Sequence, residues 1–307
     1  MRFIRVAPLY LLTAACSILS PEYDAAVALP AEPASAKSRD LDDQAHYGTR
    51  IAIPPLEEAK LLGKFEQGGW IRGVAPPNAV HVTVDGERLL LDEDRTFFVG
   101  LDRDAAERIE LVVHGIGDRT RTETVTVSPR AWKIEHVNVA RRPGGGNDEE
   151  WWKQREPEFL AIRDARAKTT GAQGWRQDFI WPVTGRISGR FGRQRIYRGE
   201  PGSYHSGLDI APGHGASFVA PADGVVVLAR TGFSLEGGIV IVDHGAGLNS
   251  AFIHLSRIAV KEGEAVRQGQ ELGNVGASGR ATGPHLHWSL MWRDKRLDPL
   301  LFLPPMP

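Results

Sequence analysis

Short runs of β-branched and aromatic residues, broken by glycine and proline, recur in two parts of this chain. Between residues 64 and 137 the runs occupy 69–74, 81–84, 97–100, 108–113, 122–127 and 132–137. Further along the chain they occupy 224–228, 238–243 and 249–253. Runs of this length, bounded by turn residues, are typical of β-strands. The pattern predicts a mostly β protein with two separate β-rich regions.

The first β-rich region has the strand density of a small sandwich. About six or seven short strands with regular turn signals, over roughly eighty residues, are typical of that architecture. Asp85-Gly86 supplies a tight hairpin turn between two of the predicted strands. We therefore expect a β-sandwich over residues 61–140.

A helical connector is expected to follow the sandwich. The glycine-rich segment 141–146 predicts a flexible break, and Asn147 can cap a helix that opens with acidic residues. Pro157 is expected to kink or divide this helix. For Trp151 and Trp152 two interpretations stay open: they form a docking surface for the C-terminal region, or they cover the helix's own neighbour.

The N-terminal residues 1–28 have the pattern of an export signal. A short basic start precedes an apolar run, 6–19, that is too short to span a bilayer comfortably. Small-x-small cleavage sites end at Ala28 and Ala36. Cys16 has two interpretations: a lipidated cysteine that anchors the mature chain to a membrane, or a small residue in a signal that is discarded.

Composition excludes some classes of partner and of covalent structure. The chain has 307 residues, one cysteine and a formal net charge of −1. One cysteine allows no disulfide within the chain, and so small a net charge does not support a nucleic-acid partner. Residues 29–60, with several prolines and mixed charges, are expected to form a tether.

Histidines gather in the second β-rich region, where six of the ten fall between residues 205 and 287. Four of them and one aspartate are spaced as His205-x-x-x-Asp209, His254 and His285-x-His287. On a strand, His285 and His287 would share one face. His205 and Asp209 would do so in an extended chain, which Gly207 favours over a helix. Imidazole and carboxylate are ligands that zinc prefers, so this spacing indicates a metal site built from neighbouring strands.

The absence of one motif narrows the kind of metal site. No His-Glu-x-x-His occurs in the chain, which excludes the arrangement of helical zinc proteases. With no carboxylate in the place of their glutamate base, a histidine must take the proton or stabilise the oxyanion, since imidazole titrates near neutral pH.

Seven short stretches together resemble the lysostaphin-type, or LytM-type (M23 family), zinc metallopeptidases that cut peptidoglycan peptides. They are Ser188-Gly189-Arg190-Phe191-Gly192, His205 to Ala211, Ala220 to Val226, Val242-Asp243-His244-Gly245, His254-Leu255-Ser256, Gly269-Gln270 and Gly283 to Trp288. They cover roughly residues 180 to 300, well under half of the chain. The preceding sandwich resembles the Ig-like domain found ahead of some bacterial LytM-type peptidases.

Carried over position by position, the resemblance implies a zinc ion and two groups of site residues. His205, Asp209 and His287 would ligate the zinc, and His254 and His285 would stand beside its water, with their separate roles left open. We also expect Tyr204, Trp288 and the loops around 233–238 to line a substrate groove. For His244, at the end of an apolar strand, a hydrogen-bonding role is favoured over support of a metal ligand; His214 is expected in an exposed turn.

The resulting domain plan has five parts. They are an export signal over 1–28, with a lipoprotein signal ending before Cys16 as its alternative, a tether over 29–60, an Ig-like β-sandwich over 61–140, a linker with a helix over 141–178 and a LytM-type peptidase domain over 179–307.

The resemblance implies a zinc-dependent endopeptidase that hydrolyses peptide bonds in peptidoglycan stem peptides or cross-bridges. The expected location is the periplasm or cell envelope of a Gram-negative bacterium. One alternative keeps the fold without catalysis, as a LytM-type activator or binding partner of cell-wall amidases. The turn and glycine pattern of residues 260–270 is shared with domains that carry biotin or lipoate. A cofactor carrier is disfavoured, because such a domain needs a lysine at the tip of an exposed hairpin and none occurs there. A further hypothesis is that the N-terminal half restrains access to the groove.

Overall fold

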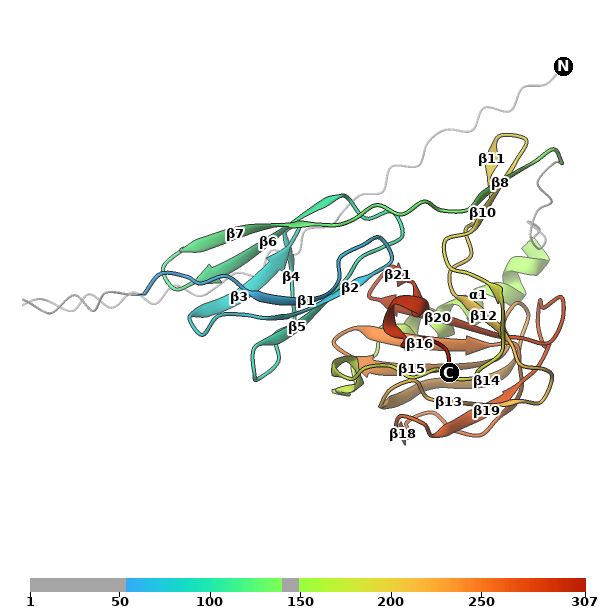
Figure 1. Cartoon of the computed structure of the whole chain (residues 1–307). Coiled ribbons are helices and arrows are strands. Elements are labelled where there is room, and N and C mark those ends of the chain that lie inside the picture. Colours follow the sequence, from blue (N-terminus) through green and yellow to red (C-terminus); the bar gives the residue numbers. More distant parts are fainter. Residues whose placement is uncertain (1–53, 140–148) are drawn as a thin grey trace, which may run out of the picture. The chain divides into compact units, whose positions relative to one another are not determined.

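The computed structural model describes residues 54–139 and 149–307 (Figure 1). The predicted export signal 1–28, Cys16, most of the tether and the glycine-rich break 141–146 lie outside the described residues. Residues 54–307 group into one compact unit. Strands predominate, as predicted, and within the described residues no helix combines the length and apolar character needed to cross a membrane.

Two sheets make up the N-terminal β-rich region. The three-stranded sheet has the order β1 (Lys60–Lys64), β2 (Trp70–Val74), β5 (Thr96–Gly100), and the four-stranded sheet has the order β4 (Glu87–Arg88), β3 (Ala79–Val84), β6 (Arg108–Gly115), β7 (Thr120–Thr126). Ile71 and Phe97 of the first sheet share one core cluster with Val82 and Leu111 of the second. Asp85 and Gly86 both have positive φ at the β3–β4 turn, as a tight hairpin requires. The likeness to an Ig-like domain stays a prediction.

The segment 132–137 was expected to be a sandwich strand, and that placement is wrong. β8 (Ile134–Val137) pairs in parallel with β10 (Gln194–Tyr197), which in turn pairs with β11 (Glu200–Pro201). Glu135 accepts from the guanidinium groups of Arg193 and Arg195. Pairing with a distant strand and the ion pairs across it therefore decide which sheet β8 joins.

A large sheet organises the C-terminal region. Its strand order is β18 (Ala265–Val266), β14 (Gly224–Phe233), β15 (Gly237–Gly245), β16 (Leu248–Ile253), β20 (Leu286–Trp292), β12 (Leu208–Ala211), β9 (Arg186–Gly189), with β21 (Lys295–Leu297) also paired to β20. A second sheet has the order β13 (Ser217–Val219), β19 (Glu271–Val275), β17 (Leu255–Ile258).

β15, an interior strand of the large sheet, is buried along its whole length. Val240 and Val242 belong to the main core cluster with Phe218, whereas Ile239 and Ile241 pack in a second cluster with Ala165. Because alternate side chains of a strand point to opposite faces, β15 is covered on both faces. This explains its almost continuous apolar sequence.

Helix α1 (Glu149–Arg166) supplies the cover on the second face. It runs without interruption through Pro157, so Pro157 does not divide the helix, and a kink at Pro157 stays a prediction. Acidic residues in its first turn and basic residues in its last suit the helix dipole. Its buried residues are Arg155 and Ala165, whereas Trp152 is 51% exposed. Arg155 and Ala165, rather than Trp152, therefore dock the helix.

Aromatic side chains join the sandwich to the C-terminal region. Trp70 and Phe98 each contact Phe302, which lies in the short 3₁₀ helix η2 (Pro299–Phe302). Phe98 also meets Trp175, in the 3₁₀ helix η1 (Gly174–Arg176). The indole Nε1 of Trp70 donates to the carbonyl of Leu301 at 3.0 Å. The two β-rich regions therefore share one packed core.

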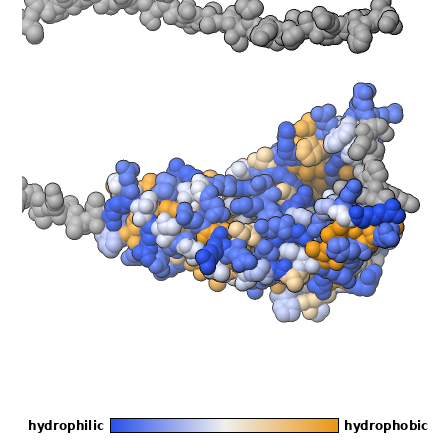
Figure 2. Space-filling model, turned by 90° about the horizontal axis from the view of Figure 1, so that it is seen from above, coloured by the Kyte–Doolittle hydropathy of each residue, from blue (hydrophilic) through white to orange (hydrophobic). Residues whose placement is uncertain are grey.

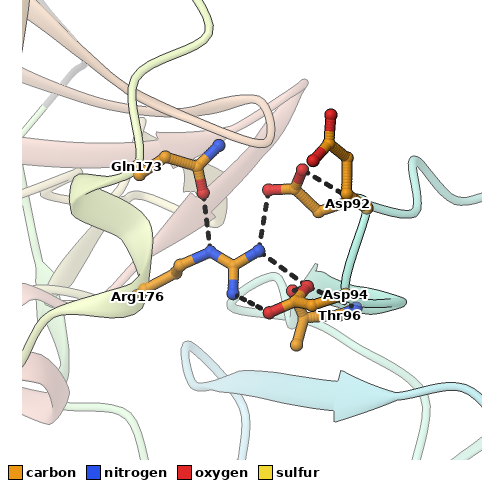
Figure 3. A network of polar contacts seen from close by, with 6 residues as sticks. Asp92, Asp94, Thr96, Gln173 and Arg176 are labelled. Carbon is orange, nitrogen blue, oxygen red and sulfur yellow. Dashed lines mark hydrogen bonds and ion pairs between the residues drawn. The ribbon is translucent and has the colours of Figure 1, made fainter.

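Polar contacts surround this aromatic joint. The guanidinium of Arg176 donates to Asp92 and Asp94 of the sandwich and to Gln173 (Figure 3). Of the predicted tether, residues 54–60 are described, and Leu56 and Ala59 are buried in the core cluster.

Figure 2 shows hydrophilic residues over much of one face of the molecule, with apolar residues scattered between them.

Candidate metal centre

The register of two strands brings Asp209 and His287 together. β12 and β20 are antiparallel neighbours, and Asp209 lies directly opposite His287. Leu208 and Ile210, on either side of Asp209, are fully buried. Side chains alternate between the two faces of a strand. Because Leu208 and Ile210 point into the core, Asp209 points to the other face. The pleat therefore presents a carboxylate and an imidazole side by side.

His205 and His285 reach the same place from outside the strands. His205 lies in the irregular segment that leads into β12, and His285 forms an isolated bridge just before β20. The expectation that all four side chains lie on two strands is therefore right for Asp209 and His287 and wrong for His205 and His285. The approach segments, rather than strand periodicity, place the second pair.

The donor atoms of three side chains fit one metal ion. One ligand atom from each of His205, Asp209 and His287 can be chosen so that all lie within 4.8 Å of one another. His205 Nε2 is 3.0 Å and His287 Nδ1 is 2.8 Å from Asp209 Oδ1. Donors bound tetrahedrally to zinc, at about 2.0–2.2 Å, are roughly 3.3 Å apart. Two imidazoles and one carboxylate are also a ligand set of catalytic zinc.

Backbone carbonyls set the tautomer of one donor ring and of both neighbouring rings. A carbonyl oxygen can only accept, so each Nδ1 that faces one must carry the proton. His205 Nδ1 donates to Arg190 O at 3.1 Å and His285 Nδ1 to Gly283 O at 2.8 Å. His254 Nδ1 donates to Ser278 O at 2.9 Å. The Nε2 lone pair of each neutral ring therefore stays available for a metal or a proton.

Two glycines make room for this cluster. A Cβ at Gly189 would lie 2.2 Å from Asp209 Oδ2 and 3.1 Å from His205 Cε1. A Cβ at Gly207 would lie 2.4 Å from the carbonyl of Trp288 and 2.8 Å from His287 Nε2. A side chain at either position would push a proposed ligand out of place.

His254 occupies a bend between β16 and β17 in the left-handed backbone region, with φ of 68°. That region is unfavourable for a residue other than glycine, and such residues cluster at functional sites. The His254 and His285 rings are 4.9 Å apart between centroids, and His285 Nε2 is 3.8 Å from Asp209 Oδ1. Both rings therefore border the three-residue donor set.

The charge states suit metal binding near neutral pH. Burial alone would raise the pKa of Asp209, but hydrogen bonds from His205 and His287 outweigh it and hold that pKa well below its usual value. Burial lowers the pKa of both His254 and His287. Asp209 is therefore ionised and the imidazoles of His254 and His287 are neutral, which are the forms that bind a cation or accept a proton. Burial alone would lower the pKa of His205, but the hydrogen bond and the charge of Asp209 outweigh it and raise that pKa. A proton that His205 holds on Nε2, toward Asp209 Oδ1, must therefore leave when a metal binds there.

The predicted substrate-binding role of Trp288 is wrong. Its side chain is fully buried, stacks on Phe252 and donates from Nε1 to Ser250 Oγ at 3.1 Å. Strand alternation turns it away from His287, its neighbour on the site face. Tyr204 is partly exposed and packs between Phe191 and the guanidinium of Arg103. Its contact with substrate stays a prediction.

Two histidines that the sequence set apart from the site are indeed elsewhere. His244 is fully buried, and its Nδ1 donates to Asp223 O at 2.8 Å while its Nε2 lies 2.8 Å from Ser250 Oγ. This confirms the hydrogen-bonding interpretation. His214 is exposed in a turn, as expected.

The donor side chains remain partly open to solvent. Side-chain exposure is 26% for His205, 18% for Asp209 and 13% for His287. α1 packs beside β14 and β15 rather than on these donors. Restraint of the site by the N-terminal half therefore stays a hypothesis.

Sequence reasoning missed the residues that support the site. Ser278 supplies the carbonyl for His254, and Glu236 supplies the carbonyl that accepts from the His254 backbone N–H at 2.9 Å. Arg155 binds the Glu236 carboxylate from α1. The only available signal was the spacing of Arg155 and Glu158, three apart on a helix, which does not reveal a partner eighty residues away.

Comparisons with known proteins show the family of this chain. Residues 203–299 match the model of peptidase family M23. A crystal structure from Pseudomonas aeruginosa, described as a peptidase M23, is 30% identical, with a TM-score of 0.59 over 78% of this chain and 95% of that one. The chain belongs to peptidase family M23. The M23 segment thus includes both proposed ligand strands and both flanking histidines.

Among the curated relatives of this M23 chain, some are named as endopeptidases and others as activators of murein hydrolases. The peptidoglycan DD-endopeptidase ShyA of Vibrio cholerae is 37% identical over 125 residues, covering 39% of this chain and 28% of ShyA. The murein hydrolase activator NlpD of Escherichia coli is 31% identical over 136 residues, covering 44% of this chain and 33% of NlpD. The matched region thus spans about a third or less of either relative.

Proposed function

We propose that this chain is a zinc-dependent endopeptidase that hydrolyses peptide bonds in peptidoglycan stem peptides or cross-bridges. The observation that carries the proposal is the grouping of donor atoms from His205, Asp209 and His287 within 4.8 Å of one another. Membership of family M23 and the name of the relative ShyA support the same reaction class. Zinc held there would polarise a scissile carbonyl and lower the pKa of a water molecule.

His254 and His285 would move the proton in this reaction. Each has a proton fixed on Nδ1 by a carbonyl and a free Nε2. A neutral imidazole whose lone pair faces the reacting water can accept its proton and pass it to the leaving amine. The protonated ring, in turn, can stabilise negative charge on the oxyanion. The two rings are close enough to divide these roles.

The second candidate function is activation of cell-wall amidases without hydrolysis by this chain. The name of the relative NlpD favours it. Against it stands the complete donor set beside two imidazoles with free Nε2 atoms. Such a cluster is not needed for a surface that only binds a partner, and buried polar groups of this kind cost stability.

The proposed location is the cell envelope of a Gram-negative bacterium, with peptidoglycan as the partner. Support comes from the export pattern in residues 1–28 and from relatives named for peptidoglycan or murein. Lipidation of Cys16 would tether the mature chain to a membrane, and mass spectrometry of the mature N-terminus tests it.

The reaction is tested with the chain from residue 29 to 307, purified and supplied with one equivalent of zinc. Products from defined cross-linked muropeptides are analysed by mass spectrometry. Peptide cleavage by the wild type, absent from Asp209→Ala, is the expected result. If the wild type binds zinc and cleaves no muropeptide but stimulates an amidase, the activator function replaces the endopeptidase.

A further inference from the structure

The tip of the β14–β15 hairpin, residues 234–236, lies between helix α1 and the bend at His254. On the side of the site, Glu236 O accepts from the backbone N–H of His254 at 2.9 Å. Leu235 O accepts from the backbone N–H of Arg280 at 2.9 Å. The tip is therefore bonded directly to the segment that carries one proposed proton-transfer residue.

On its other side the hairpin tip is held by α1. Arg155 donates from Nη1 and Nη2 to the two carboxylate oxygens of Glu236 at 2.7 and 2.8 Å. The Glu158 carboxylate accepts from the backbone N–H of Ser234 at 2.8 Å and from its hydroxyl at 2.5 Å. Arg155 and Glu158 are also paired at 2.9 Å. Two residues of the tip and two of the helix are thus joined in one network of ion pairs and hydrogen bonds.

This network is shielded from solvent. Side-chain exposure is 11% for Arg155, 11% for Glu158 and 15% for Glu236. Two-point pairing between a guanidinium and a carboxylate also fixes orientation as well as distance. Removing Arg155 would leave the buried Glu236 carboxylate without its cation, and such a charge must move toward water or be neutralised.

The bend at His254 depends on its surroundings. Its left-handed backbone, with φ of 68°, persists only if neighbouring contacts hold it. Those contacts are Glu236 O on its N–H and Ser278 O on its ring Nδ1. Ser278 is itself tied to the hairpin, because its hydroxyl accepts from Gly238 N at 2.9 Å.

We propose that Arg155 is a positioning residue for His254, acting through its ion pair with Glu236 and the hairpin tip. The inference rests on the proposed function, and it makes the connector helix part of the active centre although α1 lies outside the matched segment 203–299. A chain that begins at residue 179 would keep every proposed ligand and still lack this support.

The test uses the chain 29–307 and the substitution Arg155→Met, with Arg163→Met as the matched control. Arg163 lies on the same helix, is 59% exposed and pairs with the adjacent Asp164. Zinc content, kcat, KM and hydrogen exchange of the segments 233–238 and 253–256 are measured. Arg155→Met is expected to lower kcat roughly ten- to a hundredfold, with zinc content and KM unchanged and faster exchange in those two segments. Arg163→Met is expected to match the wild type.

Two further variants keep the proposal falsifiable. Arg155→Lys, which retains the charge, is expected to recover part of kcat. If Arg155→Met does not fold, Glu236→Gln, which keeps the shape and removes the charge, is expected to show the same local exchange and loss of kcat. Unchanged exchange near His254 in a folded Arg155→Met, or faster exchange over the whole chain, would overturn the proposal. A wild type without hydrolysis would refute the proposed function, while the exchange measurement would still decide the positioning.

Discussion

Asp209 and His287 face each other across β12 and β20, with His287 Nδ1 2.8 Å from Asp209 Oδ1. The pair exists because the strand register buries Leu208, Ile210, Leu286 and Trp288 on the opposite face. A slip of one residue would send both polar side chains into the core. The alternation of apolar residues along β12 and β20 thus determines both the packing of the core and the positions of Asp209 and His287.

Replacing either proposed proton-transfer residue should abolish most hydrolysis and leave metal binding intact. For His254→Ala and for His285→Ala we expect kcat to fall about 10²- to 10⁴-fold, the usual worth of general acid–base catalysis. Zinc content, measured by atomic absorption, should equal that of the wild type. His214→Ala, in an exposed turn, is the control and should keep full activity. Normal hydrolysis by both active-site variants would show that neither ring takes part.

Gly189→Ala should weaken metal binding without removing any ligand. The new Cβ would lie 2.2 Å from Asp209 Oδ2, so the carboxylate must shift away from the two imidazoles. We expect zinc affinity, measured by competition with a chelator, to fall by at least about tenfold, as for loss of a group that orients a ligand. Gly283→Ala, where a Cβ meets open space, is the control. Equal affinity for both variants would contradict the close approach at Gly189.

His244 should make the fold less stable in acid. Burial lowers the pKa of His244 to about 4, from the usual value for histidine of about 6.5. Between pH 6.5 and pH 4, His244 is protonated in the unfolded chain and neutral in the folded chain. The free energy of unfolding therefore falls as the pH drops through this window. The loss should reach about 3 kcal/mol at pH 4.

The pH effect is measured by urea unfolding of the wild type and of His244→Gln from pH 7 to pH 4. The variant removes the titrating ring, so its unfolding free energy should fall less steeply over this range, although it starts lower. If the free energies of unfolding of the two proteins fell in parallel with pH, His244 would not have a lowered pKa in the folded state.

The aromatic joint should matter more than the ion pairs around it. Trp70 is 9% exposed, and truncating a buried tryptophan costs about 3–5 kcal/mol. Arg176 holds the pKa of Asp94 well below its usual value, but Asp94 is 54% exposed and solvent screens the pair. Trp70→Ala should therefore lower the denaturation midpoint clearly, and Arg176→Gln should barely change it. The opposite order would show that charge, rather than packing, joins the two regions.

The resemblance to LytM-type peptidases supplied the proposed ligand set, and the strand pattern of the sequence accounts for only part of it. Asp209 and His287 follow from alternation along apolar strands. His205 and His285 do not, since irregular segments carry them and only distant backbone contacts, such as Arg190 O for His205, orient the rings. Local periodicity contains no information about such contacts.

Errors in the fold have the same cause. β8 looked like one more sandwich strand, yet its partner β10 lies sixty residues away. Trp288 was expected to line the groove, but its place directly after His287 on a strand turns its side chain into the core. α1 continues through Pro157, and contacts with the hairpin tip lie on both sides of that proline, at Arg155 and at Glu158.

Zinc stoichiometry tests the central claim most directly. The measurement compares zinc per chain in the wild type, in Asp209→Ala and in Asp164→Ala, whose aspartate is 63% exposed on α1. We predict about one zinc per chain for the wild type and for Asp164→Ala, and none above background for Asp209→Ala, since a catalytic zinc needs three protein ligands. Zinc retained by Asp209→Ala, or none bound by the wild type, would contradict a metal centre formed by His205, Asp209 and His287.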